Sequence, residues 1–137
     1  MVASVSKTFT ATIICEVQTL TISTSPPALT TVQVGIDAQP VTISFAVTQA
    51  PECLKTIAFT HTPTPPTFVT LSSITATGGN VEVNGATIAD HNTYSLVLTA
   101  TVAEDSQSVT SNFDVFIKDP CSTATFQPPT PSPLVDM

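Results

Sequence analysis

Apolar and polar residues alternate along most of the chain, which is typical of strands that have one buried face. In the clearest stretch, residues 94–102, every second residue is apolar and serine or threonine fills most of the positions between. Shorter segments of the same alternation predict strands at residues 32–36, 41–48, 57–59, 74–76, 81–83 and 109–117. No stretch follows a helical period instead. The pattern therefore predicts an all-β fold.

Turn residues divide these segments at the spacing of a β-sandwich. Gly78-Gly79-Asn80 predicts a hairpin turn, and Asn84-Gly85 and residues 103–106 predict two more. About seven strands over residues 30–118, with turns roughly every 8 to 12 residues, are typical of such a sandwich. Tyr94 stands at the start of the penultimate strand, where a tyrosine corner belongs; a plain core position is the alternative.

Composition supports this fold class and excludes several functions. Threonine is the commonest residue, at 26 of 137, whereas charged residues make up 9%. There are three lysines, no arginine and ten acids, so the net charge is −7. We expect no nucleic-acid partner, because counterion release needs clustered basic residues. We expect no membrane insertion, because no segment approaches about 18 consecutive apolar residues.

The start of the chain is similar to its last predicted strand. Residues 4–13 align with residues 108–117 at an offset of 104, and serine, valine, phenylalanine and isoleucine coincide at four of the ten positions. A cysteine and then a Pro-Pro pair follow each copy. The chain therefore divides into an N-terminal donor-strand arm (1–17), a linker (18–29), a sandwich (30–120) and a Pro/Thr-rich tail (121–137).

Two interpretations of the arm remain open. In one, the chain is a piece or terminal unit of a tandem array, and the arm is the last strand of a preceding module. In the other, the arm adds to the sheet of a neighbouring copy, and this head-to-tail contact grows a homopolymeric filament. The inter-subunit residues are then Val5, Phe9, Ala11 and Ile13. Since the sandwich already has its own last strand, the arm extends an edge or fills the gap beside a weak first strand.

Residues 94–102 and 108–117 resemble the last two strands of immunoglobulin-like and cadherin-like repeats of extracellular surface proteins. The resemblance covers residues 30–120 and implies an immunoglobulin-like sandwich of about seven antiparallel strands, here with an extra N-terminal strand arm like that of donor-strand-linked filament subunits. The chain departs from antibody-type domains, because it has no tryptophan and neither strand holds a cysteine. It departs from calcium-binding cadherins, because Asp119-Pro120 alone is not their linker motif. The resemblance implies little about activity.

Three cysteines cannot all pair within one chain. In immunoglobulin-like topology the first strand begins at the same end as the loop between the second and third strands. A Cys15–Cys53 bridge would therefore join the arm to that loop, and Cys121 would be free or bonded to another chain. The alternative pairs Cys121 of one subunit with Cys15 or Cys53 of the next. The spacing matches no zinc motif, so no metal site is predicted.

No catalytic site is predicted. His61 and His91 are isolated in turn-like stretches, and we interpret both as solvated. Glu104-Asp105 is interpreted as a solvated turn rather than as an acid–base pair. Because the chain has only four glycines and no Gly-rich phosphate loop, no cofactor is predicted.

Two proline-rich segments, residues 61–67 and 126–133, favour extended polyproline II and suit O-linked sugars. They resemble the proline-rich segments of algal and plant wall glycoproteins, which implies hydroxyproline as well as glycans. The O-glycosylation candidates are Thr62, Thr64, Thr67, Thr130 and Ser132, and the hydroxyproline candidates are Pro65, Pro66, Pro128, Pro129, Pro131 and Pro133. Unmodified stiff loops are the alternative. No Asn-x-Ser/Thr sequon occurs.

Together these features predict an extracellular structural subunit rather than an enzyme. Residues 1–12 lack the apolar core of a signal peptide, so either a signal has been removed or the chain is a piece of a longer secreted protein. The alternative function is a carbohydrate- or partner-binding module within a larger tandem secreted protein. Exposed aromatic residues would favour it, yet the chain has one tyrosine, no tryptophan and seven phenylalanines, most of them at core positions.

Overall fold

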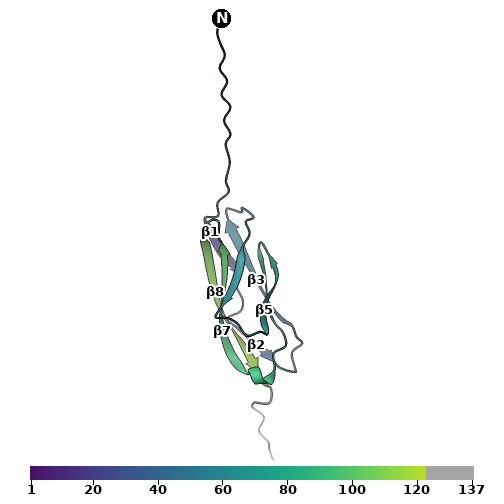
Figure 1. The fold of residues 1–137 in the computed structure, drawn as a ribbon. Helices are drawn as coiled ribbons and strands as arrows, with labels where there is room; N and C mark the ends of the chain where they lie inside the picture. The colour runs from purple at the N-terminus through teal and green to yellow at the C-terminus, as the bar shows by residue number, and fades with distance from the viewer. Residues whose placement is uncertain (123–137) are drawn as a thin grey trace, which may run out of the picture.

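Two four-stranded sheets pack face to face to form a sandwich (Figure 1). The computed structural model describes residues 1–122. The strands are β1 (Thr19–Thr24), β2 (Leu29–Gln33), β3 (Val41–Ala50), β4 (Ala58–Thr62), β5 (Val69–Thr75), β6 (Gly78–Val83), β7 (Asn92–Val102) and β8 (Gln107–Lys118), and a short 3-10 helix, η1 (Ile88–Asp90), precedes β7. The predicted all-β sandwich is confirmed, with eight strands instead of about seven.

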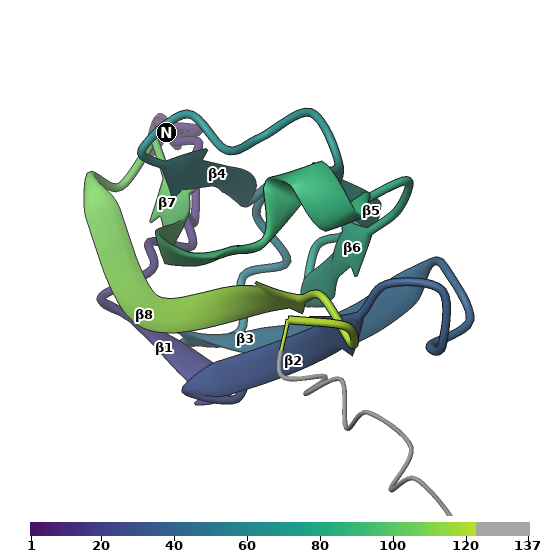
Figure 2. The same ribbon diagram turned by 90° about the horizontal axis from the view of Figure 1, so that it is seen from below.

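The strand order is that of an immunoglobulin-like domain. One sheet has the order β1-β3-β6-β5 and the other has the order β2-β8-β7-β4. Paired strands are antiparallel except for β2 and β8, which run parallel. Figure 2, seen from below, shows β2 beside the end of β8. The chain therefore changes sheets between β1 and β2, and each of these two strands forms the edge of its own sheet.

β1 lies inside residues 18–29, which the sequence analysis predicts to be a linker, and that prediction is wrong. β1 pairs antiparallel with β3, and its Leu20 is buried in the core. The alternation here covers only Leu20 and Ile22 before Pro26-Pro27 ends it. A pattern this short does not stand out from a threonine-rich background.

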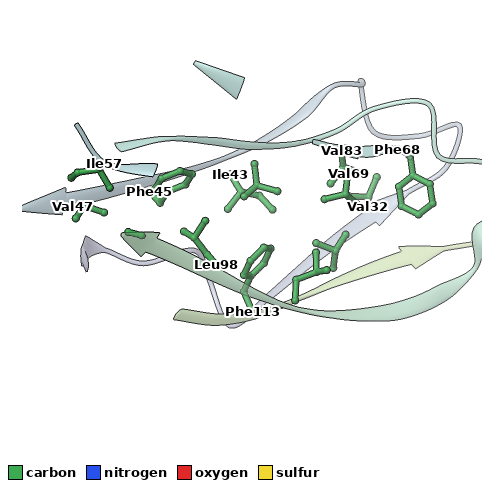
Figure 3. Packing of buried hydrophobic residues seen from close by; sticks show 14 of the residues in the cluster. Val32, Ile43, Phe45, Val47, Ile57, Phe68, Val69, Val83, Leu98 and Phe113 are labelled. Atoms are coloured by element: carbon green, nitrogen blue, oxygen red, sulfur yellow. The ribbon is translucent and has the colours of Figure 1, made fainter. Parts of the chain in front are cut away.

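The core lies between the sheets and is built from the alternating residues. From β7 and β8 it receives Leu96, Leu98, Ala100, Val102, Phe113, Val115 and Ile117, each at most 2% exposed. The first sheet contributes Ile43, Phe45, Val47, Val81 and Val83. Figure 3 shows side chains of both sheets, among them Ile43, Leu98 and Phe113, meeting in this layer. Burial of this apolar surface is the main stabilising contribution to the fold.

Tyr94 forms a tyrosine corner. Its hydroxyl donates a hydrogen bond to the backbone carbonyl of Asp90, with an oxygen–oxygen distance of 3.0 Å. Its ring packs edge-on against Phe68, with ring centroids 5.3 Å apart. Thr87 also binds Asp90: both its own hydroxyl and its backbone N–H donate to the Asp90 carboxylate at 2.8 Å. These bonds hold the chain in place where it enters β7.

The turn between β5 and β6 comes earlier than the sequence predicts. Gly78 and Gly79 are the first residues of β6, and residues 76–77 make the turn. A Cβ at Gly78 would lie 2.3 Å from the carbonyl oxygen of Phe45 in the neighbouring strand β3. Close approach of two strands therefore requires this glycine, rather than the turn itself.

The two ends of the described chain lie at opposite ends of the sandwich (Figure 1). The chain enters at the end formed by the β3–β4 loop and the β7–β8 turn, and β8 finishes at the other end. Residues 1–16 are extended, but they pair with no strand in residues 1–122, so the arm is not a strand of this domain. No helix in the described part of the chain is long and apolar enough to cross a bilayer.

Candidate functional site

In the N-terminal arm, residues 1–16, one side is mostly apolar, apart from Lys7, and the other is mostly polar, apart from Val2 and Ile14. Val5, Phe9 and Ile13 are 91%, 84% and 96% exposed, and Ala11 lies on the same side. Thr8, Thr10 and Thr12 alternate with them. Because successive side chains of an extended chain point to opposite faces, the arm presents an apolar face that nothing in residues 1–122 covers. The sequence predicted these four residues as the inter-subunit strand, and they remain a prediction.

A disulfide ties the root of the arm to the sandwich. Cys15 is bonded to Cys53 in the loop between β3 and β4, with their Cα atoms 5.5 Å apart. The sequence analysis left this bridge open beside intermolecular alternatives. With these two cysteines bonded to each other, neither is available to Cys121 of another subunit. Cys121 itself is an exposed free thiol.

Asp105, in the turn between β7 and β8, joins three parts of the chain at this end. Its Oδ2 accepts a hydrogen bond from the backbone N–H of Val17 at 2.7 Å, and its Oδ1 accepts one from the Lys55 ammonium at 2.8 Å. The hydrogen bond from Lys55, followed by the one from Val17, holds the pKa of Asp105 below its ordinary value. Glu104 makes a second ion pair with Lys55 at 3.2 Å.

The sequence predicts a solvated turn at Glu104-Asp105, and for Asp105 this prediction is wrong. The Asp105 side chain is 5% exposed, whereas that of Glu104 is 78% exposed. Val17, predicted to be part of the arm, is 1% exposed. The arm therefore ends at residue 16. No local sequence pattern signals this partly buried ion pair, because Lys55 and Asp105 are 50 positions apart.

The β3–β4 loop that carries Cys53 is closed by a side chain. The Gln49 amide donates to the carbonyl oxygen of Lys55 at 2.6 Å and accepts the Lys55 N–H at 3.0 Å. This pair imitates a strand-to-strand contact and holds the loop between its two ends. Arm, loop and turn are thus joined by the disulfide, by the two ion pairs of Lys55 and by the hydrogen bond from Val17 to Asp105.

A hollow of about 180 Å³ lies beside this loop, between it and the β5–β6 turn. Its lining is mostly apolar and includes Val47, Leu54 and Ala76, together with the polar Gln49 and Glu52. Leu54 is 72% exposed and has a positive φ of 52°, so the loop holds an apolar side chain out towards solvent. Glu52 is the titratable side chain in this lining, and it is exposed.

The two histidines lie far from the arm and apart from each other. His61 is in β4 rather than in a turn, so interpreting it as solvated is wrong; its Nε2 is buried and has no partner in residues 1–122. His91 follows η1 and is exposed, and its Nδ1 accepts the N–H of Asp119 at 3.0 Å. Among the described residues, no group of three His, Cys, Asp or Glu side chains could hold a metal ion.

The proline-rich loop leaves its threonines accessible. Thr62, Thr64 and Thr67 are exposed, and Pro65 and Pro66 are half-buried between β4 and β5. The remaining modification candidates, Thr130, Ser132, Pro128, Pro129, Pro131 and Pro133, lie outside the described residues.

Several solved structures of titin immunoglobulin domains share this fold. An I-band fragment of titin superposes with a TM-score of 0.50 at 11% identity over 73% of this chain, which spans 33% of that fragment. A chimeric titin Z1Z2 carrying a KLER peptide from decorin gives 0.50 at 14% identity, over 76% of this chain and 99% of that one. A titin–obscurin-like 1 immunoglobulin complex superposes with a TM-score of 0.52 at 11% identity, and the match covers 77% of this chain and 98% of that one.

No protein-family description matches the sequence, and no curated protein matches it either. At identities of 11% to 14% the likeness to titin concerns the fold alone. The matched structures are immunoglobulin modules, several of them in tandem. The chain is therefore an immunoglobulin-like β-sandwich that is distantly similar to titin's tandem modules, with an exposed arm bonded to one end.

Proposed function

We propose that this chain is the structural subunit of an extracellular filament or surface array, and that it assembles by adding its N-terminal arm to the sheet of a neighbouring copy. One observation carries the proposal. The arm is extended, mostly apolar along one side and without a partner in residues 1–122, while its root is covalently bonded to the sandwich. An exposed strand of this kind gains backbone hydrogen bonds and covers its apolar side when it joins another sheet.

The positions of the two chain ends favour head-to-tail assembly. The arm leaves one end of the sandwich and β8 finishes at the other. Sixteen extended residues reach about 53 Å, whereas the twelve residues of β8 span about 40 Å. An arm can therefore follow a neighbouring sandwich along its whole length. A head-to-tail contact uses two different surfaces, so it repeats and grows instead of closing.

An extracellular location is supported by the disulfide and by the surface. Disulfides persist in oxidising compartments. The surface carries few charges and many threonines, among them the exposed Thr62, Thr64 and Thr67, which we propose as sites of O-linked glycans. Hydroxyl groups and sugars would then provide the solubility that charged residues provide elsewhere. Because the site holds strand-pairing groups and no catalytic group, we propose a role in assembly and not in turnover.

A second candidate function is a partner-binding module in a tandem secreted protein. The hollow beside the exposed Leu54 favours it, because an apolar depression next to a protruding leucine suits a short apolar segment of another protein. In that case assembly would not depend on residues 1–13, and Leu54→Ser would abolish binding while leaving the oligomeric state unchanged.

The proposal is tested by deleting residues 1–13, which removes the apolar face but keeps Cys15 and the buried Val17. We expect the full chain to form fibres in negative-stain microscopy and the deleted chain to elute as a monomer. Phe9→Ser with Ile13→Ser should have the effect of the deletion. The matched control, Thr8→Ser with Thr12→Ser, alters the polar side and should assemble normally. A full chain that stays monomeric, or fibres that survive the deletion, would contradict the proposal.

A further inference from the structure

We infer that the arm of one copy pairs with the first half of β8, residues 107–113, in the next copy. This inference rests on the strand addition proposed above and names its acceptor. β7 pairs with β8 along its whole length, in eleven consecutive residue pairs. β2 covers the other side of β8 only from Asp114 to Lys118. Within residues 1–122, no strand is hydrogen-bonded to residues 107–113 on that side, although β1 of the other sheet packs close to β8.

The backbone groups of this half-strand point towards the vacant side. The N–H of Asp114 donates to the carbonyl oxygen of Ala28 at 2.9 Å, on the side of β8 that faces away from β7. Backbone groups of alternate residues along a strand point in the same direction, and the register of β8 is unbroken. Ser108, Thr110 and Asn112 therefore present their N–H and C=O groups to the vacant side, ready for another strand.

Two inward-facing apolar side chains, one on this edge and one on β1, are only partly buried. Val109 of β8 lies opposite Ala100 and faces inward, and Ile22 of β1 faces inward from the other sheet. Both are only partly buried, although their neighbours in the same layer are fully buried. A strand with one apolar side, placed next to residues 107–113, would cover both. The arm has a mostly apolar side with Val5 and Phe9, and Lys7 lies between these two residues on the same side.

Two other edges on the same side of the sandwich are closed or broken. On β2, the N–H of Gln33 donates to the Asp37 carboxylate, and its carbonyl accepts the N–H groups of Ile36 and Asp37. β1 has a register shift between Ile22 and Thr24. Such interruptions discourage pairing with another chain.

The edges on the opposite side are short or bulged. β5 has a register shift between Ser72 and Thr75, and Ser73 within it has a positive φ of 50°. β4 is five residues long. Residues 107–113, by contrast, contain no charge, proline or bulge. They are the longest regular stretch of open edge in the described part of the chain.

The direction of pairing follows from head-to-tail stacking. An arm that arrives from the end where β8 finishes runs parallel to β8, as β2 does. We place Ser6 beside Thr110, because Val5 and Phe9 then have the inward parity of Val109 and Phe113. Lys7 has the parity of Ser111 in this register. Residues 10–16 then pass β2 without pairing with it. The five residues of β2 span about 17 Å, and the seven extended residues 10–16 reach about 23 Å, so they are long enough to do so.

Disulfide trapping tests the register in the full chain. In a Cys121→Ser background, Ser6→Cys with Thr110→Cys should give a covalent ladder on non-reducing gels, since both side chains are exposed. Ser6→Cys with Thr60→Cys, on the exposed face of β4, is the matched control and should give none. Thr12→Cys with Thr110→Cys detects the antiparallel alternative. The inference is overturned if the Ser6/Thr60 pair or the Thr12/Thr110 pair gives a ladder or dimer and the Ser6/Thr110 pair does not.

Thr110→Pro provides a second test that does not depend on oxidation. Its N–H faces the vacant side, so proline there keeps the ladder to β7 and blocks the added strand. We expect the assembled fraction to fall at least about tenfold while the thermal unfolding curve keeps its cooperativity. If fibres still depend on the arm yet persist in Thr110→Pro, and Ser6→Cys with Thr110→Cys gives no cross-link, residues 107–113 are overturned as the acceptor. That result would leave the proposed function standing. If no assembly depends on the arm, both fail.

Discussion

The carboxylate of Asp105 accepts the backbone N–H of Val17 at 2.7 Å, although the two residues are 88 positions apart in the chain. The same carboxylate holds the ammonium of Lys55 from the β3–β4 loop. One side chain thus fixes where the arm begins, how the loop lies and how the β7–β8 turn is oriented. The functional site is therefore built on a contact between segments that are distant in sequence.

Asp105→Ala should destabilise the sandwich and loosen the root of the arm. The substitution leaves the N–H of the buried Val17 without its acceptor and leaves Lys55 with only the exposed Glu104, which costs more than losing an exposed contact. We expect a lower melting temperature and faster amide exchange at Val17. Glu104→Gln is the control, because Glu104 is 78% exposed and should change little. Equal melting temperatures in the two variants would show that Asp105 has no special role.

The stability of the chain should decrease at low pH through Asp105. Its pKa is lower in the folded chain than its ordinary value of 3.8, because it accepts hydrogen bonds from Lys55 and Val17. A carboxyl of this kind stabilises the fold above its unfolded pKa, and the contribution is lost as the pH falls through the folded pKa. Denaturant unfolding from about pH 6 downwards should show a loss that is smaller in Asp105→Asn. Identical pH profiles would contradict the assignment.

At high pH the stability of the chain should decrease through Lys55, the partner of Asp105. The hydrogen bond to Asp105 is the largest contribution that raises the pKa of Lys55 above 10.5. Its stabilisation is complete below the unfolded pKa and disappears as the pH rises through the folded pKa. Lys55→Met should therefore flatten the alkaline loss of stability measured by denaturant unfolding, and Lys118→Met should not.

Removing the disulfide should lower the free energy of unfolding by about 4 kcal/mol, because the bond closes a loop of roughly 39 residues in the unfolded chain. Cys15→Ser with Cys53→Ser is the variant, and urea unfolding is the measurement. Cys121→Ser is the control and should leave the free energy unchanged, since this thiol is exposed and free. A loss well under about 1 kcal/mol in the double variant would mean that the bridge is not formed in solution.

Gly78→Ala should destabilise the sandwich far more than Gly85→Ala. Both glycines have positive φ, but a Cβ at Gly78 would lie 2.3 Å from the Phe45 carbonyl, whereas one at Gly85 meets nothing within 4 Å. The Gly85 change should cost only about 1 kcal/mol of backbone strain. Thermal unfolding of the two variants gives the comparison. Similar losses in both would show that β3 can move away from β6.

The parts of the fold predicted correctly are those in which the sequence alternates over a long stretch. β7 and β8 have that alternation for eleven and twelve residues, and both were predicted within a few residues of their bounds. β1 was missed because its six residues hold only Leu20 and Ile22 as apolar inward positions. Gly78-Gly79 was taken for a turn because two glycines signal flexibility, whereas here they allow two strands to approach closely.

The candidate site also has features that local sequence predicts and features that it does not. The apolar side of the arm could be predicted because it depends on local alternation alone. Burial of Asp105 could not, because it depends on Val17 and Lys55, and no local pattern brings these residues together. Cys53 was placed correctly beside Cys15 as one of several options, since immunoglobulin-like topology brings the first strand to the β3–β4 loop.

The bond between Cys15 and Cys53 also decides how mechanical load enters the molecule. Tension applied through the arm reaches Cys15 and passes through the sulfur atoms to Cys53. Residues 16–52, which include β1, β2 and β3, lie inside the closed loop and cannot be drawn out while the bond is intact. The part of the sandwich that such tension can extend is therefore the chain after residue 53, and a reducing environment would release the rest.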